Sequence, residues 1–154
     1  MIIFNNTKIP SRDDIVKEAY TWIGVPYVDG QHSKFGCDCV GLVIGVSKAL
    51  NYLNQSWKPE YYSPQWHLHG SDELLLETLE YTGCVRKNID DRLPGDILTF
   101  QFQHLSAHAG FFMPKDTVIH SLVHQGVVHH GLRWKWHSQW LKSCWQLPGI
   151  SNEF

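Results

Sequence analysis

The sequence predicts an α+β protein in which N-terminal helices pack on a mostly antiparallel sheet. In the first half of the chain, apolar residues recur at three- and four-residue spacings, which is helical periodicity. After Gly83 the chain changes to short apolar runs separated by turn signals, which is typical of neighbouring strands. Helices followed by a run of strands indicate the α+β class.

Length and composition indicate a single domain spanning residues 1–154, long enough to bury a core. Apolar residues make up 43% of the chain and charged residues 18%, which argues against disorder. The net charge of -2 provides no basic field that would attract nucleic acid. We therefore expect no nucleic-acid partner.

The sequence carries no recognisable targeting signal. No apolar run approaches the ~18 residues that a membrane span needs. Residues 1–10 lack the charged start, apolar core and small-residue cleavage site of a signal peptide. We therefore expect a chain without a membrane span that is cytoplasmic when made. In that compartment we expect reduced thiols at Cys37, Cys39, Cys84 and Cys144.

The first predicted helix begins after Ser11. Together with Asp13 and Asp14, this serine resembles a capping arrangement that opens a helix. Gly24 and Pro26 are expected to end it.

The second predicted helix carries a candidate nucleophile. It follows a loop at residues 27–36 and runs from Asp38 to about Tyr52. Asp38 is a favourable N-cap residue, so Cys39 falls in the first helical turn. Free amides and partial positive charge there can lower a thiol pKa from about 8.5 to roughly 3.5–7.5. The alternative interpretation is an inert buried cysteine, which is the commoner case.

A segment at 54–70, rich in aromatic residues, proline and histidine, follows this helix. It lacks periodicity, so we expect an ordered surface loop that forms a wall of the substrate site, with Trp66 as a candidate substrate-binding residue. A short helix is then predicted from residues 71–73 to Tyr81, closed by Gly83.

The second half of the chain is predicted to form a sheet. Leu93–Asp96 is a turn signal that opens the first strand, and residues 114–116 suit a hairpin turn. The predicted strands are 97–100, 109–113, 117–123, 126–129 and 144–147.

Two histidines flank the expected hairpin turn. His108 opens one strand and His120 lies in the next, seven and five residues from Lys115 respectively. Antiparallel pairing places residues that are symmetric about a turn close together, so the two imidazoles are expected to be neighbours. Cysteine, histidine and a second polar group form the cysteine-peptidase arrangement, in which one histidine is the base and the other group orients it.

These residues match a known family. The sequence resembles NlpC/P60 cell-wall peptidases at five motifs that occur in the same order, over roughly residues 12–148. The motifs are Tyr27–Gly30, Asp38–Val43, Pro94–Phe100, His108–Gly110 and Val118–Ser121. The Gly-Cys-Asp-Cys-x-Gly-Leu-Val form, with Tyr62–Pro64 and Trp66 afterwards, resembles the phage-associated branch of that family.

The resemblance implies a papain-like α+β fold and a role for each matching residue. Cys39 would be the nucleophile, His108 the general base and His120 the orienting residue. Tyr27, with the Cys39 backbone amide, would bind the oxyanion, and Asp38 would organise the helix start. Two departures, Val40 in place of serine and Ala109 in place of a larger aliphatic residue, leave this triad intact.

The activity implied by the resemblance is hydrolysis of an amide bond in the peptidoglycan stem peptide, between D-γ-glutamyl and diaminopimelate or lysine. Peptidoglycan or a muropeptide would be the substrate, and no cofactor is implied. The protein would reach the wall as part of a phage tail or by a dedicated export route. Two alternatives remain open: a tail-assembly component that uses the fold for interaction, and an amidase or acyltransferase on the same scaffold.

The remaining cysteines and histidines have simpler interpretations. Cys84 and Cys144 are expected to be buried apolar residues. Cys37 with Cys39 could suggest zinc, but this spacing lacks the second close pair of a structural site, so no metal is expected. Surface or satisfied core positions are expected for His32, His67, His69, His104, His124, His129, His130 and His137.

Overall fold

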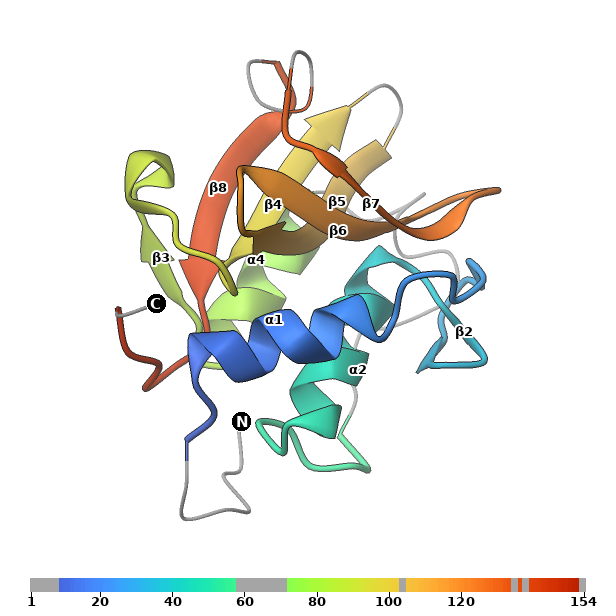
Figure 1. Ribbon diagram of the computed structural model, residues 1–154, viewed down its shortest axis with the longest axis horizontal. Helices are drawn as coiled ribbons and strands as arrows, with labels where there is room; N and C mark the ends of the chain where they lie inside the picture. The colour runs from blue at the N-terminus through green and yellow to red at the C-terminus, as the bar shows by residue number, and fades with distance from the viewer. Residues whose placement is uncertain (1–8, 58–71, 103–104, 134–135, 137–138, 153–154) are drawn as a thin grey trace.

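The computed structural model describes residues 9–57, 72–102, 105–133, 136 and 139–152. Within these residues there are three helices and a six-stranded antiparallel sheet, so the predicted α+β class is confirmed. Helices α1 and α2 lie on one side of the molecule, below the yellow-to-red strands of the sheet in Figure 1. The helices are α1 (Arg12–Tyr20), α2 (Cys39–Ala49) and α4 (Asp72–Tyr81), with a 3-10 turn η1 (Ile89–Asp91).

The sheet has the strand order β3-β8-β4-β5-β6-β7. Its strands are β3 (Val85–Lys87), β4 (Ile97–Phe102), β5 (Leu105–Met113), β6 (Thr117–Leu122), β7 (Gly126–Gly131) and β8 (Leu141–Gln146). All five predicted strands are present, several of them longer than expected. Strand β3 was not predicted, and neither was the two-stranded ribbon of β1 (His32–Ser33) and β2 (Gly36–Cys37).

Local capping sets the start of helix α1. Ser11 and Asp14 form the predicted capping box, in which each side chain accepts a hydrogen bond from the backbone amide of the other residue. The helix ends at Tyr20, with Thr21 as its C-cap, four residues before the expected stop at Gly24. The predicted capping is therefore confirmed, and only the C-terminal boundary differs.

The sheet is buried on both faces at its centre. Ile97 belongs to the main core between the helices and the sheet, whereas Leu98 belongs to a second cluster on the other face. Alternation along a strand sends neighbouring side chains to opposite faces. Helix α2 packs against β5, which fixes the start of this helix relative to the strand that carries His108.

The segment before Tyr27 is anchored on strand β7. The Gly24 amide donates to the Val127 carbonyl at 3.0 Å, and the Val127 amide donates to the Val25 carbonyl at 2.9 Å. Gly126 permits this approach, because it has a φ of +76° and an added Cβ would lie 2.5 Å from the Val25 oxygen. Within the described residues, no helix combines the length and the apolar character needed to cross a bilayer.

Candidate active site

Cys39 is the first residue of helix α2, and Asp38 is its N-cap, as predicted. The Cys39 sulfur accepts a hydrogen bond from the backbone amide of Ala109, the residue directly after His108. Cys37 lies before the helix, on β2, where its carbonyl accepts a hydrogen bond from the Ser121 hydroxyl at 2.8 Å. The two cysteines therefore occupy different environments, and only Cys39 has first-turn amides beside its sulfur.

The carboxylate of Asp38 joins the helix to the loop before it. One oxygen accepts a hydrogen bond from the Gly41 amide at 2.6 Å, and the other accepts one from the Gly30 amide at 2.8 Å. An added Cβ at Gly41 would lie 1.9 Å from the Gln31 carbonyl oxygen, so glycine permits the loop to pack on the first turn. Asp38 thus positions both the Cys39 turn and the loop that bears Tyr27.

His108 and His120 are brought together, as the hairpin predicted. The Nε2 atom of His108 lies 2.8 Å from Nδ1 of His120, and both side chains are buried. Gly110 pairs with His120 across β5 and β6, which makes His108 its diagonal neighbour. An added Cβ at Gly110 would lie 2.8 Å from the His120 Cβ, so this glycine leaves room for the second imidazole.

The predicted low pKa of the Cys39 thiol is wrong for this structure. Burial raises the pKa of Cys39 to about 12, and the Asp38 charge adds to this effect, while the backbone amides of Ala109, Val40 and Cys39 oppose it. Burial also lowers the pKa of His108 to about 3. Burial therefore favours the neutral thiol of Cys39 and the neutral imidazole of His108, because desolvation disfavours a charge on either group and opposes the effect of the helix start.

Tyr27 lies near Cys39 at the start of the loop. Burial, the interaction with Cys39 and a hydrogen bond to Asp29 raise the pKa of the Tyr27 phenol far above its usual range. The phenol therefore keeps its proton and remains a hydrogen-bond donor.

An open cleft of about 640 Å³ adjoins this tyrosine. Residues 26–29 form one side, and residues 123–126, which comprise the turn between β6 and β7 and the first residue of β7, form the other. The sequence predicts a substrate wall at segment 54–70 instead. Trp66 and most of that segment lie outside the described residues.

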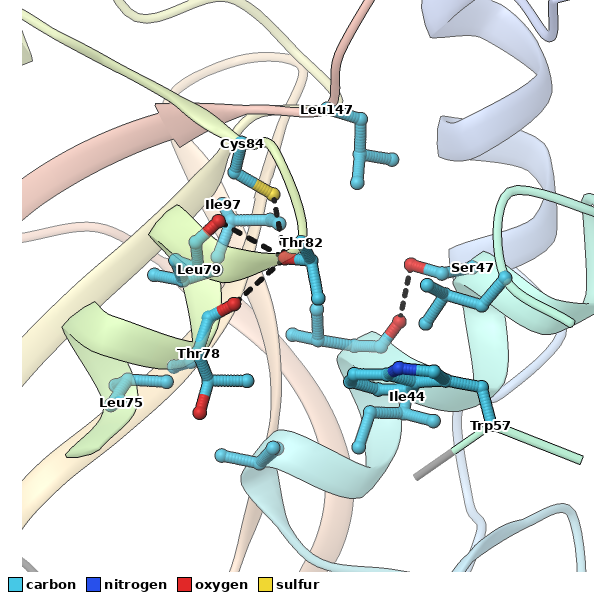
Figure 2. Close-up of a pocket in the computed structure, with 14 residues that line it drawn as sticks. Ile44, Ser47, Trp57, Leu75, Thr78, Leu79, Thr82, Cys84, Ile97 and Leu147 are labelled. Carbon is cyan, nitrogen blue, oxygen red and sulfur yellow. Dashed lines mark hydrogen bonds between the residues drawn. The ribbon is translucent and has the colours of Figure 1, made fainter. Parts of the chain in front are cut away.

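A separate apolar pocket lies between α2 and α4 (Figure 2). Val40 and Ala109, which each directly follow a predicted site residue, line it. The hydroxyls of Ser47 and Thr82 in its wall donate to backbone carbonyls one helical turn earlier, at 2.7 and 2.9 Å. Because these hydroxyls are already used, the pocket has the character of a packing feature and not of a peptide-binding site.

The structure adds one residue to the predicted site. Nε2 of His130 lies 2.6 Å from Nε2 of His120, and Nδ1 of His130 lies 2.9 Å from the Gly131 carbonyl oxygen. His130 was expected to be an ordinary surface or core residue. A hairpin register counted across the turn at 123–125 was the available signal, since it makes His130 a diagonal neighbour of His120.

All four cysteines are buried and free. Among the residues that the structure describes, no group of three or more histidine, cysteine, aspartate or glutamate side chains is arranged to hold a metal ion.

No protein-family model matches this chain. The chain is 29% identical to probable endopeptidases of Mycobacterium bovis and Mycobacterium tuberculosis over 110 residues, which cover 71% of this chain and 23% of each relative. It is 25% identical to a probable endopeptidase of Haemophilus influenzae over 136 residues, covering 87% of this chain and 71% of that one. The match thus spans about a quarter of the length of the mycobacterial relatives.

Solved structures resemble the chain over most of its length. The NlpC/P60 domain of the peptidoglycan hydrolase SagA superposes with a TM-score of 0.60 and 20% identity, covering 88% of this chain and 97% of that one. An NlpC/P60 family protein from Bacillus cereus gives a TM-score of 0.66 and 20% identity, covering 94% of this chain and 43% of that one. The chain therefore has the papain-like α+β fold of NlpC/P60 domains.

Proposed function

We propose that this chain is an NlpC/P60 cysteine peptidase that hydrolyses an amide bond in the peptidoglycan stem peptide, between D-γ-glutamyl and diaminopimelate or lysine. One observation carries the proposal: His108 is hydrogen-bonded to His120, and the backbone amide of the next residue, Ala109, contacts the Cys39 sulfur. Relatives named probable endopeptidases and a solved peptidoglycan hydrolase with the same fold support it.

In the proposed reaction, Cys39 attacks the scissile carbonyl as its thiol proton passes to His108. Since Nε2 of His108 is engaged by His120, Nδ1 is the nitrogen that accepts the proton. The S–C bond forms, the C–N bond breaks, and the leaving amine takes the proton back from His108. Water then attacks the thioester with His108 as base, which releases the acid and restores the thiol.

Two donors suit the negative charge that develops on the carbonyl oxygen. The Tyr27 phenol is protonated, and the Cys39 backbone amide lies at the free start of helix α2. The open cleft beside Tyr27, between residues 26–29 and 123–126, provides a route for the peptide. The thiol proton leaves Cys39 during the attack and not before it, because burial favours the neutral forms of both the thiol and the imidazole.

Turnover of purified muropeptides tests the proposal. We expect water to be added at the γ-glutamyl bond, which mass spectrometry of the products detects. Cys39→Ser should abolish the reaction, and Cys37→Ser is the matched control that should retain it. Cleavage at the lactyl–alanine bond would indicate an amidase, and a product joined to an amine would indicate an acyltransferase. A folded protein without turnover would favour the interaction role.

The phage association is a finer part of the same proposal. It rests on the form of residues 36–43, which resembles the phage-associated branch. Tail proteins would then be partners, and the tail or a dedicated export route would bring the enzyme to the wall. Mass spectrometry of purified phage particles tests this part, since the chain should be found in them.

A further inference from the structure

Three imidazoles form one hydrogen-bonded chain across strands β5, β6 and β7. His108 contacts His120 at 2.8 Å, and His120 contacts His130 at 2.6 Å. His130 in turn contacts the Gly131 carbonyl at 2.9 Å. The ring of Trp136 packs on all three, with centroid separations of 5.8 Å from His108, 4.6 Å from His120 and 5.4 Å from His130. His108 and His120 are buried, whereas His130 is only partly buried.

The contact between His130 and the Gly131 carbonyl, at the end of this row of imidazoles, determines which nitrogen of each ring carries a proton. The Gly131 carbonyl can only accept, so His130 carries its proton on Nδ1 and presents the Nε2 lone pair. His120 must therefore donate from Nε2 and accept at Nδ1, and His108 must donate from Nε2. The proton-free nitrogen of His108 is then Nδ1, the nitrogen assigned above as the base. If all three histidines are neutral, this is the only assignment of protons that gives every contact one donor and one acceptor.

We propose that His130 is a positioning residue of the active site, which sets the tautomer of His108 through His120 and receives the positive charge when Cys39 loses its proton. This inference rests on the proposed function. The charge moves by two shifts once Nδ1 of His108 has gained the thiol proton. The Nε2 proton of His108 passes to Nδ1 of His120, and the Nε2 proton of His120 passes to Nε2 of His130. The reverse shifts return a proton to the leaving amine.

The environment favours a positive charge on His130, at the outer end of the row of imidazoles, over one on His108 or His120. Burial lowers the pKa of both His108 and His120, so a positive charge is costly on either ring. Among the described residues, the titratable or charged groups recorded near His130 are the two inner histidines, His129 on the same strand and Arg133, whose Nε would lie 3.3 Å from a Cβ added at Gly131. All of these groups are basic, which leaves the Gly131 carbonyl and solvent at the partly buried ring as the groups that can stabilise a positive charge on His130.

Nitrogen-15 NMR of the resting protein tests the tautomers without any substrate. We expect Nε2–H on His108 and His120 and Nδ1–H on His130. His130→Gln keeps an acceptor for His120 and should preserve the inner tautomers, whereas His130→Ala should alter the His120 signal. An Nδ1–H signal on His108, or unchanged His120 signals in His130→Ala, would overturn the proposal. This result stands even if the chain proves not to be a peptidase.

Kinetics supply the second measurement. His130→Ala should lower kcat by about 10-fold with little change in KM, which is less than the about 10²–10⁴-fold that the acid–base group itself typically contributes. His130→Gln should recover part of the loss and move the acid limb of the kcat profile to lower pH, because a proton then enters only at the buried imidazoles. His129→Gln is the matched control, since that ring contacts Thr117 Oγ1 at 2.8 Å and lies outside the chain. An acid limb that stays in place in His130→Gln would contradict the proposed charge acceptor.

Discussion

Arg12 and Asp96 form a buried ion pair that ties helix α1 to the sheet. Nη1 of Arg12 lies 2.7 Å from Oδ1 of Asp96, and neither side chain is exposed. The second carboxylate oxygen faces Lys87 Nζ at 3.0 Å and accepts from the Leu93 amide at 2.7 Å. The carboxylate is thus paired and hydrogen-bonded, which is the condition for holding a charge in a protein interior.

We expect Arg12→Ala to lower the free energy of unfolding by about 3 kcal/mol, because the buried Asp96 carboxylate would lose its partner at 2.7 Å and keep only Lys87 as a charged partner. Urea denaturation measures the loss. Asp13→Ala is the control, since it removes a pair with Lys17 whose side chains are 57% and 72% exposed. Exposed pairs contribute little, so the control should unfold like the parent protein. Similar losses in both variants would contradict the assigned role.

Cys39 should resist simple alkylation despite being the proposed nucleophile. Burial raises the pKa of both Cys37 and Cys39 to about 12, so neither is a thiolate near pH 6. We expect a short iodoacetamide pulse at that pH to label neither residue, as read by peptide mapping. A γ-glutamyl peptide carrying a nitrile should label Cys39 alone, since it occupies the substrate site. Rapid labelling of Cys39 by iodoacetamide at pH 6 would show that the pKa of its thiol is low, as the sequence predicts.

The two inner histidines should differ in their effect on turnover. His108→Ala should abolish measurable activity, because acid–base catalysis is typically worth about 10²–10⁴-fold. His120→Ala should leave residual activity, because His120 acts on His108 through the 2.8 Å contact and does not itself take the thiol proton. His120→Gln should recover part of that loss by offering an acceptor. Steady-state kinetics on a muropeptide measures all three, and equal, total loss in folded His108 and His120 variants would remove this division of roles.

Gly110→Ala should disturb the site from the strand beneath it. The new Cβ would lie 2.8 Å from both the His120 Cβ and the Ile119 carbonyl oxygen, neither of which can swing away. We expect a loss of about 1–3 kcal/mol in stability, which is typical of overpacking, and at least ~10-fold in kcat. Gly131→Ala is the control for stability, since the three atoms nearest to its added Cβ all belong to the flexible Arg133 side chain, at 3.3 Å or more. A Gly110 variant with parental melting temperature and kcat would show that the sheet can adapt.

Stability should fall as the pH drops below about 6.5. The pKa of His108 is lowered to about 3 and that of His120 is lowered well below its ordinary value, both chiefly by burial. Below pH 6.5 the unfolded chain therefore binds protons that the folded chain excludes, and each such group costs about 1.4 kcal/mol per pH unit. This contribution is complete above pH 6.5 and is lost as pH falls toward 3. Urea denaturation at several pH values from 7 to 5 gives the free energy of unfolding against pH, which should fall less steeply for His120→Gln than for the parent protein. An equally steep fall in both would argue that His120 is not excluded from protonation.

Local signals predicted most of the elements that carry the site. The Ser11 capping box and the Asp38 cap depend on a few neighbouring residues, and both are present. The turn at 114–116 implied the pairing that brings His108 beside His120. Capping and tight turns are short-range properties, so the sequence states them directly.

Long-range properties were not predictable in the same way. The two-residue strands β1 and β2 are held by contacts with distant parts of the chain, such as the Ser121 hydroxyl on the Cys37 carbonyl. The pKa of Cys39 depends on burial, which the cap alone does not reveal, and burial reversed the expected direction. The role of His130 required counting register through a second hairpin.

The amide of Ala109 reaches the sulfur of Cys39 across 70 positions of sequence. Pairing of this separation has a high loop-closure cost and forms late relative to local helices and hairpins. A refolding chain therefore acquires its helix start and its histidine chain separately, and neither piece alone has both nucleophile and base. Recovery of hydrolysis during refolding should lag behind far-ultraviolet circular dichroism and coincide with the final docking of α2 on β5. If the proposed hydrolysis holds, its rate of recovery therefore reports the slowest step of folding.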